Sequence, residues 1–87
     1  MRELRVKVKT ETGLHARTAS LLVNAVSKFK SSITVEKEGQ KANLKSLLGL
    51  LSLGVLQNDE IVIRASGKDE KEVIEALVDC GKTHDLW

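Results

Sequence analysis

The stretch that decides the fold is residues 2–29, RELRVKVKTETGLHARTASLLVNAVSKF, because the spacing of its apolar residues changes halfway along. Over residues 2–9 apolar and charged side chains alternate, and this period of two is typical of a strand with one buried face. A loop punctuated by Gly13 follows. From Ala16 to about Phe29 apolar residues recur at intervals of three and four, which predicts an amphipathic helix. The chain therefore begins with a strand that leads into a helix.

Alternating apolar residues also predict strands at residues 33–36 and 61–64. The turn signal KEGQ at residues 37–40 predicts a hairpin, whose returning strand is expected at residues 41–44. A leucine-rich segment predicts a short helix at about residues 47–53 that ends near Gly54. With a last helix near the C-terminus, the order of elements is strand, helix, strand, strand, helix, strand and helix. We expect an α+β fold in which a four-stranded sheet and the helices form two layers around one core.

The last helix is expected to begin soon after Gly67. Asp69 and Glu72 are three residues apart and resemble a capping box, with Asp where Ser or Thr is usual. Apolar residues at helical spacing predict the buried face of this helix: Val73, Ile74, Leu77 and Val78. We expect the helix to end or fray at Gly81, and His84 in the polar C-terminal segment KTHDLW to be solvated.

The composition indicates a soluble globular chain. Of its 87 residues 41% are hydrophobic and 30% are charged, and no internal repeat is present, so we expect a single domain over residues 1–87. No apolar run approaches the roughly 20 residues that span a bilayer, so membrane insertion is not expected. The N-terminus alternates charged and apolar residues, unlike a secretory signal, and this favours a cytoplasmic location.

The charge, aromatic and cysteine content argues against several classes of function. A net charge of +2, from 14 basic and 12 acidic residues, is too balanced for a nucleic-acid binder, and only two aromatic residues, Phe29 and Trp87, are available for base stacking. Cys80 is the single cysteine, so no intrachain disulfide is possible. Only His15 and His84 could join it as metal ligands, and they lie far apart in sequence. We therefore expect neither a metal site nor a cofactor.

Residues 13–17, GLHAR, carry the candidate chemistry. A neutral imidazole is a good nucleophile near neutral pH, and His15 is expected just before the first turn of a helix. There the unpaired N–H groups of Ala16, Arg17 and Thr18, together with the Arg17 guanidinium, would stabilise the oxygens of a phosphoryl group on the ring. The alternative is that His15 is only a capping or surface residue, which is the commoner role of a lone histidine in such a place.

Three motifs at their family spacing resemble those of HPr, the histidine-containing phosphocarrier of the bacterial phosphoenolpyruvate:sugar phosphotransferase system. TGLHAR at residues 12–17 resembles its active-site motif, and NLKSLLGLLSLGV at residues 43–55 resembles its regulatory-serine motif. ASG at residues 65–67, followed by DE at residues 69–70, resembles the start of its last helix. The resemblance covers nearly the whole chain. It implies an open-faced β-sandwich, a four-stranded antiparallel sheet covered on one side by two long helices and one short helix.

The resemblance also implies a function and its partners. His15 would accept a phosphoryl group from enzyme I and donate it to sugar-specific IIA components, with Arg17 stabilising the phosphate, so the protein would be a carrier in sugar transport and not an enzyme. Ser46 would be a regulatory phosphorylation site, the substrate of an HPr kinase/phosphorylase. Its position before the short helix also predicts an N-cap.

The leucines of residues 44–56 cannot all point inward from a two-turn helix, so we expect them to divide between core and surface. Leu50 and Leu53 are the candidates for the core. The resemblance implies a partner-binding surface that consists of Arg17, Ser20, Lys45, Leu47, Leu48 and Leu51, and we expect its three leucines to form an exposed apolar patch near His15. The alternative is that the small domain hides these leucines under a loop.

The chain departs from the family pattern in ways that keep a second function open. HPr usually has proline where this chain has Thr18, whose N–H and hydroxyl can both bond locally. Several HPr proteins carry lysines where this chain has Asn24, Ser27 and Gly49, and these lysines help contact an acidic face of enzyme I. We therefore expect weaker electrostatic attraction to enzyme I here. A regulatory HPr-like paralog, which acts through Ser46 phosphorylation on a transcription regulator and transfers phosphate weakly, is the alternative to a phosphocarrier. Either protein is expected to be a monomer.

Overall fold

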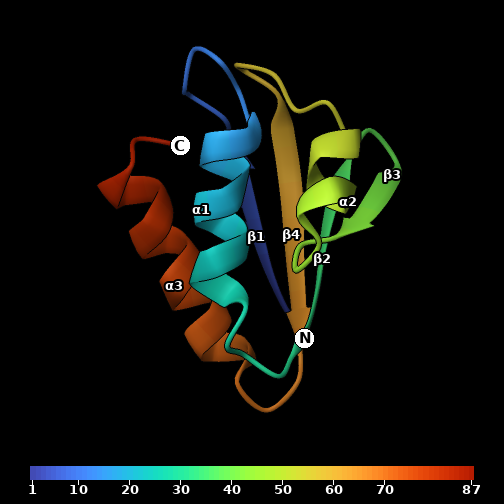
Figure 1. The fold of residues 1–87 in the computed structure, drawn as a ribbon. Coiled ribbons are helices and arrows are strands. Elements are labelled where there is room, and N and C mark those ends of the chain that lie inside the picture. Colours follow the sequence, from blue (N-terminus) through green and yellow to red (C-terminus); the bar gives the residue numbers. More distant parts are fainter.

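A four-stranded sheet forms one layer and three helices cover one of its faces in the computed structural model, which describes residues 1–87 (Figure 1). The elements along the chain are β1 (Arg2–Lys7), α1 (Ala16–Val26), β2 (Ser32–Lys37), β3 (Gln40–Asn43), α2 (Leu47–Ser52), β4 (Glu60–Ser66) and α3 (Glu70–Thr83). The expected order of elements and the open-faced sandwich are thus confirmed. None of the three helices is long and apolar enough to cross a bilayer.

The strand order is β1-β4-β2-β3, and every neighbouring pair is antiparallel. In this register Ile63 of β4 lies opposite both Leu4 of β1 and Val35 of β2. Because alternate residues of a strand face opposite sides of a sheet, these three side chains share one face, and they belong to or pack against the hydrophobic core. The alternation of apolar residues in the sequence therefore marks the face that the helices cover.

The other face of the sheet carries charged side chains in ion pairs. The Nε atom of Arg64 lies 3.0 Å from a carboxylate oxygen of Glu3, and its Nη1 atom lies 2.7 Å from one of Glu36. The hydrogen bond from Arg64 holds the pKa of the Glu36 carboxyl below its usual value. These pairs are partly exposed and add little to stability, but they let this face of the sheet meet water without a second layer of helices.

The core contains 17 buried apolar residues, which come from every layer of the fold. Leu22 of α1, Leu50 of α2 and Leu77 of α3 are fully buried, and Leu53 is buried directly after α2, so both leucines expected in the core are there. The first long helix ends at Val26, earlier than the predicted end at about Phe29. The Ser27 hydroxyl donates to the Asn24 carbonyl at its C-terminus, a local bond that competes with continuation of a helix.

The start of α3 differs from the predicted capping box. Asp69 occupies the N-cap position, but its side chain makes no capping hydrogen bond to the helix. Its carboxylate instead accepts hydrogen bonds from the N–H groups of Lys30 and Ser31, at 2.8 and 3.0 Å, and from the Ser31 hydroxyl. Glu70, not Glu72, reaches back and accepts from the Gly67 N–H at 3.1 Å. Asp69 therefore ties the start of α3 to the segment that enters β2.

The end of α3 also differs from the prediction, because the helix continues through Gly81 to Thr83. A Cβ atom on Gly81 would lie 2.2 Å from the Nε1 atom of Trp87, so the indole packs directly over this glycine. Leu86 is fully buried, and its carbonyl accepts a hydrogen bond from the Lys9 N–H at 2.7 Å. Gly81 thus serves close packing of the C-terminal residues rather than helix termination. Val78, which was expected on the buried face, is 42% exposed.

We expect Asp69→Asn to lower the Tm at neutral pH and to weaken the acid dependence of the Tm. The Ser31 hydroxyl first, and then the Lys30 N–H, hold the pKa of the Asp69 carboxyl below its ordinary value of 3.8. Stability from a lowered pKa is present above the unfolded-state pKa and is lost as the pH falls through the folded-state pKa. The asparagine side chain offers a single acceptor oxygen to the three donors, and it does not titrate.

Thermal melts of wild type and Asp69→Asn between neutral and acid pH measure this effect. Glu72→Gln is the matched control, because Glu72 is an exposed first-turn carboxylate that makes no hydrogen bond back to the N-cap. If Glu72→Gln lowered the Tm as much as Asp69→Asn, a capping box between Asp69 and Glu72 would account for the stability. The hydrogen bonds from Asp69 to the segment before β2 would then not be its source.

Candidate functional site

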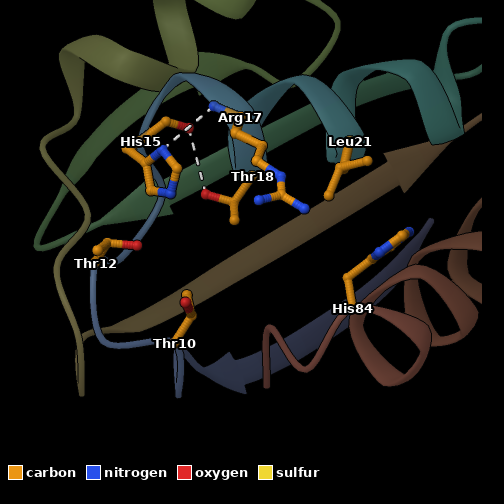
Figure 2. Close-up of a pocket in the computed structure, with 7 residues that line it drawn as sticks. All are labelled: Thr10, Thr12, His15, Arg17, Thr18, Leu21 and His84. Carbon is orange, nitrogen blue, oxygen red and sulfur yellow. Dashed lines mark hydrogen bonds between the residues drawn. The ribbon is translucent and has the colours of Figure 1, made fainter.

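His15 is the N-cap residue of α1 and is exposed to solvent. Its backbone is extended, with φ −90° and ψ −175°, and its Nδ1 atom accepts a hydrogen bond from the Arg17 N–H at 3.3 Å (Figure 2). An accepting nitrogen holds a lone pair, so the hydrogen of the neutral ring lies on Nε2. The N–H groups of Ala16 and Thr18 lie in the first turn, where no intrahelical acceptor is available to them. The Nδ1 atom of His15 therefore faces the positive end of the α1 dipole.

The loop before His15 is held by the segment that follows α2. Gly13 has φ +65°, and a Cβ atom there would lie 2.3 Å from the Val55 carbonyl oxygen, so only glycine fits. That carbonyl also accepts a hydrogen bond from the N–H of Leu14, which is buried. The position of His15 therefore depends on packing between the loop at Leu14 and the loop at Val55, which lie about 40 residues apart in the sequence.

Thr18 replaces the usual family proline and makes the local bond that its hydroxyl allows. The Oγ1 atom donates to the Gly13 carbonyl at 3.0 Å. It also lies 3.3 Å from the His15 carbonyl (Figure 2). The side chain is buried, so these bonds are shielded from water. Thr18 therefore joins the first turn of α1 to the loop that carries His15, a role that proline cannot perform.

Thr18→Val is expected to destabilise the fold by about 1 kcal/mol, because it leaves the Gly13 carbonyl without its side-chain donor at nearly unchanged volume. Urea denaturation measures this loss. Thr18→Ser is the control, since it keeps the hydroxyl and removes only a methyl group. Equal stability of Thr18→Val and wild type would show that the hydroxyl bond contributes nothing.

A cavity of about 270 Å³ opens beside His15 (Figure 2). Its lining residues are Thr10, Thr12, His15, Arg17, Thr18, Leu21 and His84. The lining contains no carboxylate, and the Arg17 side chain takes part in no ion pair. The structure thus brings His15 and Arg17 together as expected, at a cavity whose hydroxyl and cationic groups suit an anion. His84 is exposed, as expected, but its position on this cavity was not predicted, because the contact depends on how the C-terminus packs.

Ser46 and Lys45 both contribute to the start of α2. The Ser46 Oγ atom accepts a hydrogen bond from the Gly49 N–H at 3.0 Å, which confirms the predicted N-cap. The Lys45 ammonium donates to the Phe29 carbonyl at 2.5 Å and is half-buried. Lys45 therefore links α2 to the end of α1 instead of standing free at the surface. Ser20 is also half-buried, on α1.

The expected leucine patch is smaller than predicted. Leu48 is 80% exposed and Leu47 is 36% exposed, and we call these two residues the leucine pair. Leu51, which was expected in the exposed patch, is half-buried and packs against the core. Leu56, which was not singled out, is 63% exposed beside the loop at Gly13. No group of three His, Cys, Asp or Glu side chains is placed to hold a metal ion.

The fold and site define a small α+β protein with an exposed histidine at the start of a helix, beside a cavity suited to an anion. The family model described as the PTS HPr component phosphorylation site matches residues 2–82. The chain belongs to this HPr family of phosphocarriers of the phosphotransferase system, whose members are carrier proteins and not catalytic enzymes.

Solved structures of the family agree with this assignment. The chain is 32% identical to the histidine-containing phosphocarrier protein of Mycoplasma, with 98% of this chain and 97% of that chain covered and a TM-score of 0.94. It is 48% identical to HPr-C-His from Thermoanaerobacter tengcongensis, with coverage of 95% and 93% and a TM-score of 0.90. It is also 40% identical to the catabolite repression protein Crh of Bacillus subtilis, a domain-swapped dimer in its crystal structure, with coverage of 95% and 95% and a TM-score of 0.74.

Proposed function

We propose that this protein is a phosphocarrier that accepts a phosphoryl group on His15 from enzyme I and passes it to IIA components of sugar permeases. The observation that carries the proposal is the exposed His15 ring, whose Nδ1 atom faces the Arg17 N–H at the mouth of a carboxylate-free cavity. We place the protein in the cytoplasm, as a monomer that works as one HPr-like domain over residues 1–87.

The transfer uses the lone pair on Nδ1. This atom attacks the phosphorus held by enzyme I, an N–P bond forms as the bond to the donor breaks, and the electron pair of that bond leaves with enzyme I. The proton on Nε2 stays on the ring during the step. The Arg17 N–H, which donates to Nδ1 in the resting protein, then donates to a phosphoryl oxygen instead. The Ala16 and Thr18 N–H groups and the Arg17 guanidinium neutralise the remaining oxygens.

Docking uses surface near the start of α1 and α2. The leucine pair offers exposed apolar area, the usual mark of a partner surface, and α1 packs directly against α2. Arg17 supplies a free cation on the same side as His15. Lys45 acts indirectly, because its bond to the Phe29 carbonyl holds α2 in place. Transfer to IIA components reverses the chemistry at the same nitrogen.

The second candidate is a regulatory protein that acts through phosphorylated Ser46 on a transcription regulator. The 40% identity to Crh favours it, since that relative is described as a catabolite repression protein. The geometry around His15 favours the phosphocarrier, because Nδ1 and the Arg17 N–H are already in hydrogen-bond contact. Ser46 serves either function.

Incubation of the purified protein with enzyme I and phosphoenolpyruvate tests the proposal. We expect one phosphoryl group per chain, labile in acid and stable in base as a phosphohistidine is, and its passage to a IIA component. If enzyme I does not label the folded protein, but an HPr kinase/phosphorylase labels it on Ser46, the regulatory function replaces the phosphocarrier function as our conclusion.

A further inference from the structure

Residues 54–59 connect α2 to β4, and we call this segment the support loop because the loop before His15 packs on it. The Val55 carbonyl accepts a hydrogen bond from the Leu14 N–H at 3.0 Å, directly before the N-cap residue of α1. The segment before α1, the support loop and the turn between β2 and β3 all lie at one end of the sheet (Figure 1). The position of the His15 backbone therefore depends on what holds the support loop in place.

Lys37, the last residue of β2, holds the support loop together with a carboxylate of the loop itself. The Lys37 ammonium donates to the Gly54 carbonyl at 2.8 Å and lies 2.8 Å from a carboxylate oxygen of Asp59. The same oxygen accepts a hydrogen bond from the Leu56 N–H at 2.8 Å, and that N–H donates to no backbone carbonyl. The ammonium and the carboxylate thus bind the support loop on both sides of Val55.

The pair of Lys37 and Asp59 is more shielded from water than an ordinary surface ion pair. Its side chains are 15% and 25% exposed, whereas those of the pair Lys9–Asp85 are 61% and 85% exposed. The Lys37 ammonium first, and then the Leu56 N–H, hold the pKa of the Asp59 carboxyl below its usual value, so this group is charged at neutral pH. A shielded pair that also bonds to the backbone keeps a defined geometry, unlike an exposed pair.

We propose that Lys37 and Asp59 are positioning residues for phosphoryl transfer, which hold the support loop so that His15 meets the phosphoryl group in one geometry. The inference rests on the proposed function of His15. Both side chains act through the loop, because neither lines the cavity beside His15. The link continues from the Val55 carbonyl to the Leu14 N–H and so to the start of α1. Misplacement of a reacting group by about 1 Å can lower a rate about 100-fold, so a small shift of the loop is sufficient.

Lys37→Met tests the proposal, because it keeps the aliphatic stem and removes the donor and the charge. In single-turnover transfer from phosphorylated enzyme I, we expect the maximal rate to fall about fivefold, which corresponds to one lost hydrogen bond of about 1 kcal/mol. The protein concentration at half-maximal rate should not change, since the leucine pair and Arg17 remain. Lys37→Arg should restore the rate, because a guanidinium can donate to the Gly54 carbonyl and the Asp59 carboxylate together.

Amide hydrogen exchange shows whether the effect passes through the support loop. In Lys37→Met the Leu14 N–H should exchange about fivefold faster, because its acceptor, the Val55 carbonyl, is held less firmly, while the amides of β4 keep their protection. Asp59→Ala is a second, independent variant and should act in the same way, which keeps the test decisive if Lys37→Met does not fold. Arg64→Met is the matched control, since it removes a paired cation from the open face of the sheet and should change neither the rate nor this exchange.

These outcomes separate the inference from the proposed function. If the folded Lys37→Met and Asp59→Ala variants transfer at the wild-type rate, or if Arg64→Met loses as much, the positioning role is wrong and the phosphocarrier function stands. If enzyme I labels neither wild type nor any variant, the phosphocarrier function is wrong. The exchange of the Leu14 N–H then still decides whether the pair holds the loop before His15, and unchanged exchange would overturn the inference.

Discussion

His15→Ala is expected to abolish labelling by enzyme I and phosphoenolpyruvate while the fold is retained. The phosphoryl acceptor in our proposal is the His15 Nδ1 atom, and no other side chain in the lining of the cavity accepts a hydrogen bond from the first turn of α1. His15 is exposed, so its removal leaves no hole in the core. The loss of the cap to the Arg17 N–H costs about 1 kcal/mol of stability. Labelling with radioactive phosphoenolpyruvate and thermal melts measure the two effects.

His15→Asn is the matched control for the cap. Asparagine accepts a hydrogen bond at an N-cap position but is no nucleophile, so this variant should melt like wild type and remain unlabelled. Arg17→Ala should slow transfer and leave the fold intact, because the Arg17 side chain is exposed and unpaired. Continued labelling of His15→Ala would contradict the proposal and direct the search to His84, the other imidazole on the cavity.

Ser46→Asp is expected to reduce the rate of transfer from enzyme I about tenfold or more, which corresponds to about 1.4 kcal/mol in docking. The new carboxylate would lie directly before the leucine pair and face the acidic surface that the family resemblance assigns to enzyme I. The fold should hold, because Asp can accept from the Gly49 N–H as Ser46 does and a negative charge is favourable at a helix N-terminus. Phosphorylation of Ser46 adds more charge, roughly −1.5 to −2, and should suppress transfer further.

Ser46→Asn isolates the effect of charge, since it has the size and capping ability of Asp without its charge. We expect it to transfer like wild type. Ser46→Ala should also transfer, with a stability loss of about 1 kcal/mol from the missing cap. Equal rates for Ser46→Asp and Ser46→Asn would rule out an electrostatic block. A sharply lower Tm for Ser46→Asp alone would show that the charge disturbs α2 rather than the partner surface.

The sequence by itself determined the order of the elements, most of the residues on their buried faces, and the residues that meet at the starts of α1 and α2. These features depend on contacts within one strand or one helix turn. Apolar residues that alternate along β1 and β4 all lie on one face of the sheet. Apolar residues spaced three and four apart along α1 all lie on one face of that helix. The hydrogen bond between His15 and the Arg17 N–H joins residues two apart. The bond between Ser46 and the Gly49 N–H joins residues three apart. Each bond lies within a single turn, so local spacing was sufficient to predict it.

The tertiary structure decided the features that join distant segments. Asp69 left its expected capping box because three donors from residues 30–31 hold its carboxylate more strongly than the first turn of α3 would. Gly81 lies within α3 and leaves the space that the Trp87 indole occupies. His84 reached the His15 cavity because Leu86 is buried against the end of β1. Each of these contacts depends on which side chains meet after the helices cover the sheet, and no local pattern of residues carries that information.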